Sequence, residues 1–386
     1  MNTATAPIAV AGIGVRQYKR ATAPLPEQGV LITAILDACA DAGLDPADID
    51  GFASYGDDKN DPTRMMKDLG TRELTWSSQI WGGGGGGLPG AFGVAAAALR
   101  AGEAKYVVVF RALVQATSGR LSGAVMAHHL NDHLMGAGLL APAVDCAMRA
   151  QRMMEYHQVP QHCVEDLVRA SYYHGARNPK AVTYGKELDV EAYRNSRYIC
   201  EPFHLFDCSR ENDGAGAIIL TTAERARDLA HKPVYLKGHA QGAGKGWGDL
   251  CHNEKDYASA GFESVARRLY ARTGLSPADI DVVQLYENFS AQGIASLIDH
   301  GFCTYENVGE VVRYDNLIAP TGKLPVNTSG GNLAQGFIHG FGMAIEAVEQ
   351  LRGTSSNPVA GARHCLLAGG PGSPIVSSAI FSTESI

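Results

Sequence analysis

The 386-residue chain lacks several features that would place it at once in a functional class. No apolar run approaches the ~18–20 residues that a transmembrane helix needs, so the sequence predicts no membrane span. The N-terminus lacks the charged and apolar regions of a signal peptide, and the eight cysteines include no CxxC pair. We therefore expect reduced thiols and a cytoplasmic location. A net charge of -7 without a basic cluster argues against nucleic-acid binding.

Motifs for cofactors and metals are incomplete. Gly12-Ile-Gly14 lacks the third glycine of a dinucleotide fingerprint, and the glycine run 82–87 is not followed by the Lys-Ser/Thr of a Walker loop. His129 and His133 have the i, i+4 spacing of a zinc helix, but Leu130 stands where the zincin motif has glutamate. We interpret these histidines as a polar lid face, and predict no metal and no bound cofactor.

What the sequence does contain is an internal repeat. Residues 43–50 return as residues 274–281, and the two copies differ only at Asp45 against Ser276. Each copy follows a helical pattern and leads into a short apolar run that ends in a tyrosine. Self-similarity of this kind predicts two related structural halves.

The two halves continue with the same order of elements. A β-type run opens each half, at 7–15 and 233–238, and the run that ends in tyrosine lies at 51–55 and 282–286. A glycine-rich turn, an Ala/Gly-rich helix and a buried strand follow, at 82–87, 92–101 and 106–110 in the first half and at 327–332, 337–351 and 365–369 in the second. Apolar runs that alternate with helices predict βα units around buried sheets. We expect an α/β fold in which the duplicated halves stack on their central helices, layered α/β/α/β/α.

The boundary between the halves is predicted after residue 231, which gives an N-terminal half at 1–231 and a C-terminal half at 232–386. The first half carries a long insertion at 113–206, with helical patterns at 141–156 and 163–174. A long excursion at the end of a buried strand usually forms a substrate lid or a subunit interface. We therefore expect a lid region here.

Four segments besides the duplication carry a family resemblance: residues 201–215 (EPFHLFDCSRENDGA), 286–289 (YENF), 327–336 (NTSGGNLAQG) and 368–372 (AGGPG). They are similar to the thiolase superfamily, and more narrowly to its sterol-carrier-protein-type branch. The similarity extends over nearly the whole chain and implies the thiolase fold.

The residues of thiolase chemistry are missing. A thiolase needs a cysteine thiolate at the N-terminus of its central helix, where backbone dipoles favour the anion, but residues 81–90 contain no cysteine. The family's Gly-His-Pro turn matches residues 336–338, so Phe337 replaces the imidazole. The second thiolase cysteine matches Leu366, and Cys365, one residue away, faces the opposite side of a strand. We interpret Cys365 as a buried structural thiol and do not expect an acyl-enzyme.

Tyr286 matches the asparagine that lies near the thioester in thiolases. A tyrosine at this position resembles the steroid side-chain-cleaving aldolases, and the resemblance implies that Tyr286 takes the proton of a β-hydroxyl group. A free phenol has a pKa near ~10, so this role requires a neighbouring cation, donor or helix end. The alternative is a buried strand-end tyrosine bonded to the backbone, which is how we interpret its repeat mate Tyr55.

The related aldolases carry a second tyrosine in the segment that matches residues 336–337, and this chain has none there. His339 is the candidate replacement as acid or base, because it titrates near neutrality. On the start of a helix its two-residue offset would turn it away, so a histidine on a helix face or interface is the alternative. Backbone N–H groups of the glycine loops are expected to hold the enolate oxygen. The substrate-binding candidates are Glu287, Asn288, Phe337, Gly369, Gly370 and Gly372.

The sequence thus predicts an acyl-CoA lyase that cleaves a bulky, steroid-like β-hydroxyacyl-CoA by a retro-aldol reaction, with coenzyme A present only as part of the substrate. One alternative is a thiolase-like acyltransferase with a relocated nucleophile at Cys208, Cys303 or Cys365. The other is a non-catalytic acyl-CoA-binding subunit. The resemblance also implies a homodimer and a small partner protein with an OB-fold and a zinc ribbon.

Overall fold

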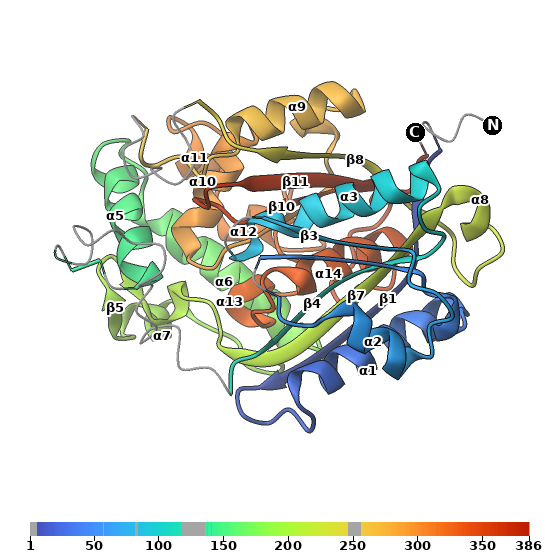
Figure 1. Ribbon diagram of the computed structural model, residues 1–386. Helices are drawn as coiled ribbons and strands as arrows, with labels where there is room; N and C mark the ends of the chain where they lie inside the picture. The colour runs from blue at the N-terminus through green and yellow to red at the C-terminus, as the bar shows by residue number, and fades with distance from the viewer. Residues whose placement is uncertain are drawn as a thin grey trace.

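Two central helices lie between two layers of strands in the computed structural model of the chain, which describes residues 6–56, 58–81, 84–116, 136, 138–139, 141–245 and 256–385 (Figure 1). The central helices α3 (Leu88–Ala101) and α14 (Phe341–Arg352) contact strands of both halves. Helix α1 (Glu27–Ala42) covers the outer face of the first layer, and α9 (Glu263–Thr273) covers the outer face of the second. The predicted α/β/α/β/α arrangement is therefore confirmed.

The strands of the two halves join in a single hydrogen-bonded sheet among the described residues, in the order β3-β2-β4-β7-β1-β8-β11-β10-β9. At the seam, β1 and β8 share only the pairs Ala9↔Tyr235 and Val10↔Val234, so packing on the central helices holds the halves together more than this ladder does. The strands are β1 (Ile8–Lys19), β2 (Gly51–Tyr55), β3 (Trp76–Ile80), β4 (Val107–Val114), β7 (Asn212–Thr222), β8 (Val234–Gly242), β9 (Val282–Leu285), β10 (His364–Gly369) and β11 (Val376–Ser382).

The repeated segments have the same structural task in each half. Each forms a 3-10 turn, η2 (Pro46–Asp48) or η7 (Pro277–Asp279), before the strand that ends at the tyrosine. The last residue of each repeat then accepts hydrogen bonds from the backbone just before a neighbouring parallel strand. Asp50 accepts from Tyr106 N at 2.9 Å, and Asp281 accepts from His364 N at 2.9 Å. The repeat therefore fixes the register of β2 beside β4 and of β9 beside β10.

The insertion packs on the second half. Its helices α5 (Pro142–Glu155) and α6 (Gln161–Arg177) lie against α10 (Ser290–Asp299), and they share an apolar cluster with it. The other short elements are α2 (Pro62–Leu69), α7 (Val190–Arg194), β5 (Tyr198–Cys200), β6 (Phe203–His204), α8 (Ala223–Ala226), α11 (Val308–Val311), α12 (Tyr314–Leu317) and α13 (Gly331–Ala334). Within the described part of the chain, no helix is long and apolar enough to cross a membrane.

The second central helix begins later than the sequence predicts. Residues 337–340 form a turn, and α14 starts only at Phe341. Gly336, His339 and Gly340 have φ values of 153°, 45° and 83°, so the chain cannot enter the helix before this point. The expectation of a helix from 337 is wrong, and the helical-offset argument about His339 therefore does not apply.

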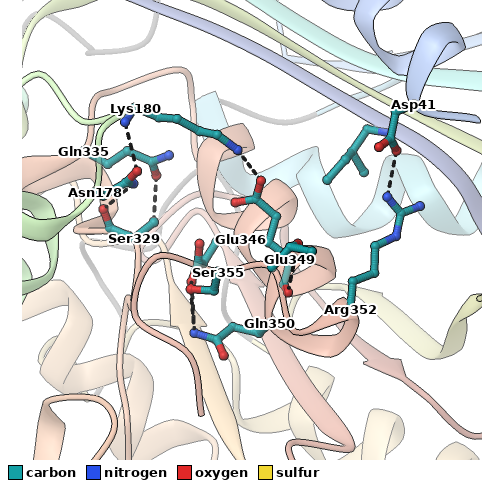
Figure 2. A network of polar contacts seen from close by, with 12 residues as sticks. Asp41, Asn178, Lys180, Ser329, Gln335, Glu346, Glu349, Gln350, Arg352 and Ser355 are labelled. Atoms are coloured by element: carbon teal, nitrogen blue, oxygen red, sulfur yellow. Dashed lines mark hydrogen bonds and ion pairs between the residues drawn. The ribbon is translucent and has the colours of Figure 1, made fainter. Parts of the chain in front are cut away.

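A network of buried polar side chains joins α14 to Thr328 before it and Ser355 after it in the sequence (Figure 2). Glu346 is 2% exposed, and its Oε1 accepts hydrogen bonds from Thr328, Gln350 and Ser355. Near the end of the helix Arg352 forms an ion pair of 2.7 Å with Asp41 of α1, and so ties the central layer to the outer one. Burial raises the pKa of Glu346 from 4.5 to about 7 despite these donors.

The raised pKa of Glu346 makes stability depend on pH. The folded state binds this proton more tightly than the unfolded chain, so the contribution is full below the unfolded pKa of 4.5 and is lost as the pH rises to about 7. Between about pH 5 and about pH 8 the loss amounts to about 2 kcal/mol. Over the same pH range, we expect the free energy of unfolding of Glu346→Gln, measured in denaturant, to fall by about 2 kcal/mol less than that of the parent. Glu263→Gln, which removes an exposed carboxylate of α9, is the control, because the charge of Glu349 itself raises the pKa of Glu346. An unchanged dependence of stability on pH in Glu346→Gln would contradict the assignment.

Candidate active site

The candidate site is built around Tyr286, which follows β9 and points into the layer between the two halves. Its backbone N–H donates to Ala368 O at 3.0 Å, which fixes the residue beside the end of β10. The side chain is 3% exposed and belongs to the apolar cluster that contains the central helices. Its ring lies edge-on to Phe337, with 6.0 Å between the ring centroids.

Glycines make the room that the Tyr286 ring occupies. Residues Gly84–Gly87 form the 3-10 turn η3 that enters α3. A β-carbon on Gly85 would lie 2.0 Å from Cε2 of Tyr286, and one on Gly340 would lie 2.7 Å from its Cδ2. Any side chain at Gly85 would therefore displace the ring. The glycine run thus brings the phenol to the N-terminus of the central helix, where the family places its nucleophile.

The surroundings of Tyr286 act on its pKa in opposite directions. Burial raises the pKa well above the usual value of 10, because a charged phenolate loses its hydration. The positive charge of Arg111 and a hydrogen bond from the Gly85 main chain lower it, but only in part. Arg111, the Gly85 main chain and the N-terminus of α3 therefore act on Tyr286, but burial outweighs the two groups that lower the pKa, and the pKa of the phenol stays above 10.

His339 joins the same cluster through Phe337, since the centroids of these two rings are 5.1 Å apart. The histidine is half-buried and lies in the turn before α14. Its main-chain oxygen accepts a hydrogen bond of 2.9 Å from the hydroxyl of Tyr55. The fold thus brings Tyr286, Phe337 and His339 together, while their roles in catalysis stay predictions.

Glu287 faces away from Tyr286, toward the short helix α13. Its Oε1 accepts a hydrogen bond from Leu333 N at 3.4 Å, and the side chain of Asn327 also bonds to it. Burial raises the pKa of Glu287 to about 8, so this carboxyl group is largely protonated at neutral pH. These contacts favour a supporting role for Glu287, and its predicted contact with substrate stays untested.

The loop after β10 packs directly on the glycine run. A β-carbon on Gly369 would lie 2.6 Å from Gly85 O, and one on Gly370 would lie 2.2 Å from the Cα of Gly86. The N–H of Gly372 donates to Ala260 O at 2.8 Å, so this amide is already engaged. Asn288 is half-buried, and its side-chain oxygen has no hydrogen-bond partner among the described residues. Of the predicted groups, Asn288 therefore has a side-chain oxygen open to a ligand, whereas Gly369 and Gly370 are buried against the glycine run.

Arg111 is a residue that the sequence analysis missed. It lies in β4, is 2% exposed, and its Nη1 is 3.7 Å from the carboxylate of Asp58. The signal was present in the sequence, because β4 reads VVVFRALV and a charged residue within a buried strand needs a partner. Its pairing with Asp58, in the loop after the neighbouring strand β2, could not be inferred from that pattern.

The candidate thiol nucleophiles are poorly suited to attack. Burial raises the pKa of both Cys208 and Cys303 to about 12, and raises that of Cys365 well above the ordinary thiol value. Cys365 and Leu366 belong to the inner and outer apolar clusters, so they face opposite sides of β10 as predicted. The reactive form of cysteine is the thiolate, and these surroundings disfavour it.

Metal ligands do not gather in the described ranges. No group of three or more His, Cys, Asp or Glu side chains there could hold a metal ion. His129 and His133, the pair with the spacing of a zinc helix, lie outside the described residues.

Comparisons with known proteins agree with the residue-level picture. Residues 244–382 match the thiolase C-terminal domain-like family. The chain is 37% identical to a 17-hydroxy-3-oxo-4-pregnene-20-carboxyl-CoA lyase of Mycobacterium tuberculosis, over 95% of this chain and 97% of that protein. It is 34% identical to a steroid side-chain-cleaving aldolase of Thermomonospora curvata, over 95% of each chain.

Solved structures give the same family. The structure of an Ltp2-ChsH2(DUF35) aldolase matches with a TM-score of 0.91 and 33% identity, covering 98% of both chains. Human mitochondrial 3-ketoacyl-CoA thiolase matches with a TM-score of 0.68 and 13% identity over 98% of this chain and 99% of that one, which shows the shared fold alone. The chain therefore belongs to the thiolase superfamily and, within it, to the steroid side-chain-cleaving aldolases, which makes it a carbon–carbon lyase.

Proposed function

We propose that the chain cleaves the side chain of a steroid β-hydroxyacyl-CoA by a retro-aldol reaction in which Tyr286 is the base. The observation that carries the proposal is the position of the Tyr286 phenol. It stands at the N-terminus of α3, beside a main-chain donor and a buried arginine, where a thiolase has its thiolate. The substrate class follows from the relatives, one of which is named for a 17-hydroxylated steroid with a carboxyl-CoA group at carbon 20.

The reaction balances with these residues alone. The phenolate oxygen of Tyr286 takes the proton of the β-hydroxyl group, and the electron pair left on that oxygen forms the ketone. The bond between the α and β carbons breaks, and its electrons pass to the thioester as an enolate. His339 then supplies a proton to the α carbon and releases the shortened acyl-CoA. For a 17-hydroxy steroid with the thioester carbonyl on carbon 20, the products are a 17-ketosteroid and a three-carbon acyl-CoA.

Stabilisation of the enolate falls to the loop after β10. Fixed N–H donors are most effective where negative charge develops in a site without water. Gly369 and Gly370 lie against the glycine run beside Tyr286, and they are the donors that we assign to the thioester oxygen. The Gly372 amide, which is bonded to Ala260, is not among them.

The same proposal covers the partners of the chain. The aldolase of similar structure is named for its assembly with a DUF35 protein, and we propose that this chain also works with a small partner that carries an OB-fold and a zinc ribbon. Strand β3, at one edge of the described sheet, would pair with its copy in a homodimer. We place the enzyme in the cytoplasm, with no cofactor apart from the coenzyme A of its substrate.

Replacing Tyr286 with phenylalanine tests the proposal. We expect kcat to fall about 10²–10⁴-fold, as for loss of a general base, while KM changes little because the ring remains. The substrate is 17-hydroxy-3-oxo-4-pregnene-20-carboxyl-CoA, assayed with the DUF35 partner co-purified. Because burial holds the pKa of Tyr286 above its usual value of 10, the phenolate stays the minor form up to alkaline pH. The kcat/KM of the parent enzyme should therefore rise with pH throughout the alkaline range without levelling off, and Tyr286→Phe should lose this rise.

Tyr270→Phe is the control for this experiment. Its hydroxyl donates to His300 O at 3.1 Å on the outer side of the second half, far from the proposed chemistry. The control should keep the parent activity. Normal cleavage by Tyr286→Phe would remove Tyr286 from the mechanism, and no cleavage by the parent enzyme would reject the substrate class.

An acyltransferase would form an acyl-enzyme, whereas the proposed mechanism forms no covalent intermediate with the chain. We expect intact mass spectrometry to find no acyl adduct on the chain during turnover, because no thiol is attacked. Cys208→Ser and Cys303→Ser should retain activity within about twofold, since burial keeps both thiols protonated. A trapped thioester on either cysteine would support the acyltransferase instead.

A further inference from the structure

Tyr55, the repeat mate of Tyr286, lies in the same inner layer and touches the site through its hydroxyl group. It ends β2 as Tyr286 follows β9, and both belong to the apolar cluster between the halves. Tyr286 is near enough to raise the pKa of Tyr55. The Tyr55 hydroxyl donates to His339 O at 2.9 Å, across 284 positions of the sequence.

The bond from Tyr55 acts on an unusual part of the backbone. His339 has a φ of 45°, a left-handed conformation that non-glycine residues rarely adopt. Such a conformation persists when the surroundings determine it. A hydrogen bond to the carbonyl oxygen of His339 restricts rotation of that peptide and so sets the direction of the imidazole beside Phe337.

Arg111 holds Tyr55 in turn. Its Nη1 donates to Tyr55 O at 2.6 Å, and its Cζ lies 5.5 Å from the centroid of the Tyr55 ring. The neighbouring carboxylate of Asp58 accepts hydrogen bonds from Asn60 N at 2.8 Å and Ala112 N at 3.2 Å, so the acid has fixed partners besides the arginine. A buried ion pair is costly to form, so the Arg111–Asp58 pair is weak evidence for stability of the fold. Its position next to Tyr55 indicates a role in the site instead.

The charge of Arg111 reaches Tyr286 as well. The charged or titratable groups that act on the pKa of Tyr286 are Arg111 from β4, Glu287 after β9 and Cys146 from α5. Those that act on the pKa of Tyr55 are Arg111, Asp58 after β2 and Tyr286. His339 lies beside Tyr286 across Phe337. Arg111 is the only cation in this set, and it opposes the effect of burial on the pKa of Tyr286.

We propose that Tyr55 and Arg111 are positioning residues of the reaction: Tyr55 orients His339 through its main-chain oxygen, and Arg111 clamps Tyr55 through its hydrogen bond to Tyr55 O and its place over the Tyr55 ring. The inference rests on the proposed function, because it assigns supporting roles to the same chemistry. A merely structural Tyr55 would affect folding, whereas a positioning Tyr55 affects turnover and its pH dependence.

Tyr55→Phe tests the first role. The substitution removes one hydroxyl and leaves the ring, so the fold should survive. We expect kcat to fall about tenfold, the size of effect that a hydrogen bond of 1.4 kcal/mol would have, with KM unchanged. Tyr270→Phe removes the same kind of bond, from a tyrosine hydroxyl to a histidine main-chain oxygen, and should lose no activity. A Tyr55→Phe enzyme with parental kcat would overturn this role.

Arg111 is tested by removing its contacts with Tyr55. Arg111→Met is combined with Asp58→Asn so that no unpaired carboxylate stays buried. We expect kcat to fall about tenfold in the double variant with KM unchanged, because Tyr55 loses the hydrogen bond at its main-chain oxygen and His339 loses its orientation. Adding Tyr55→Phe should cause little further loss. Parental kcat in a folded double variant, or a further tenfold loss on adding Tyr55→Phe, would overturn the role of Arg111.

A second measurement separates this inference from the proposed function. The orientation of the His339 imidazole is followed without substrate by its nuclear magnetic resonance signals, assigned by comparison with His339→Gln. Tyr55→Phe and the double variant should shift these signals, whereas Tyr270→Phe should not. If the parent cleaves no steroid thioester but the shift appears, the proposed function fails and the positioning role stands. If cleavage depends on Tyr286 but no shift appears, the positioning inference fails alone.

Discussion

The contact between the glycine run at the start of α3 and the ring of Tyr286 is the constraint on which the site depends. Gly85 and Gly340 leave the space that the ring fills, and Gly370 brings the loop of the second half against the same run. Three segments from distant parts of the sequence therefore meet without side chains between them. The consequence is a phenol oxygen held at the end of a buried helix, where a family of enzymes otherwise places sulfur.

The duplication explains why two tyrosines meet in this layer, but the chemistry is not symmetric. Tyr286 receives a main-chain donor, whereas Tyr55 donates to a main-chain acceptor. The buried positive charge comes from one strand of the first half only. Two halves with the same fold thus supply different functions: one carries the proposed reactive group, and the other holds the residues that orient its surroundings.

The layers could be predicted from the sequence because the repeat, the apolar runs and the turn residues are local signals. The start of α14 could not, since Gly336, His339 and Gly340 adopt conformations that depend on contacts made elsewhere in the fold. Tyr286 could be predicted because it matches the asparagine that lies near the thioester in thiolases. Its partner Arg111 was missed, because a lone arginine in an apolar strand does not reveal which distant residue it faces.

The electrostatic state of the site was also beyond the sequence. A Tyr-Glu dipeptide suggests two active groups, yet the strand directs the tyrosine into the inner layer and the glutamate toward α13. Burial then keeps that glutamate largely protonated. Residues next to each other in the chain therefore end in separate environments, as alternation along an extended backbone requires.

The shared central layer has a consequence for synthesis of the chain. Helix α14 packs on β1 and β7 of the first half, although it is made after almost all of the polypeptide. The part of the inner apolar face of the first half that α14 covers therefore stays exposed until the second half has been translated, although α3 already packs on β2, β4 and β7. This delay favours nascent chains that are shielded by a chaperone, and it disfavours any truncated product that ends before Arg352.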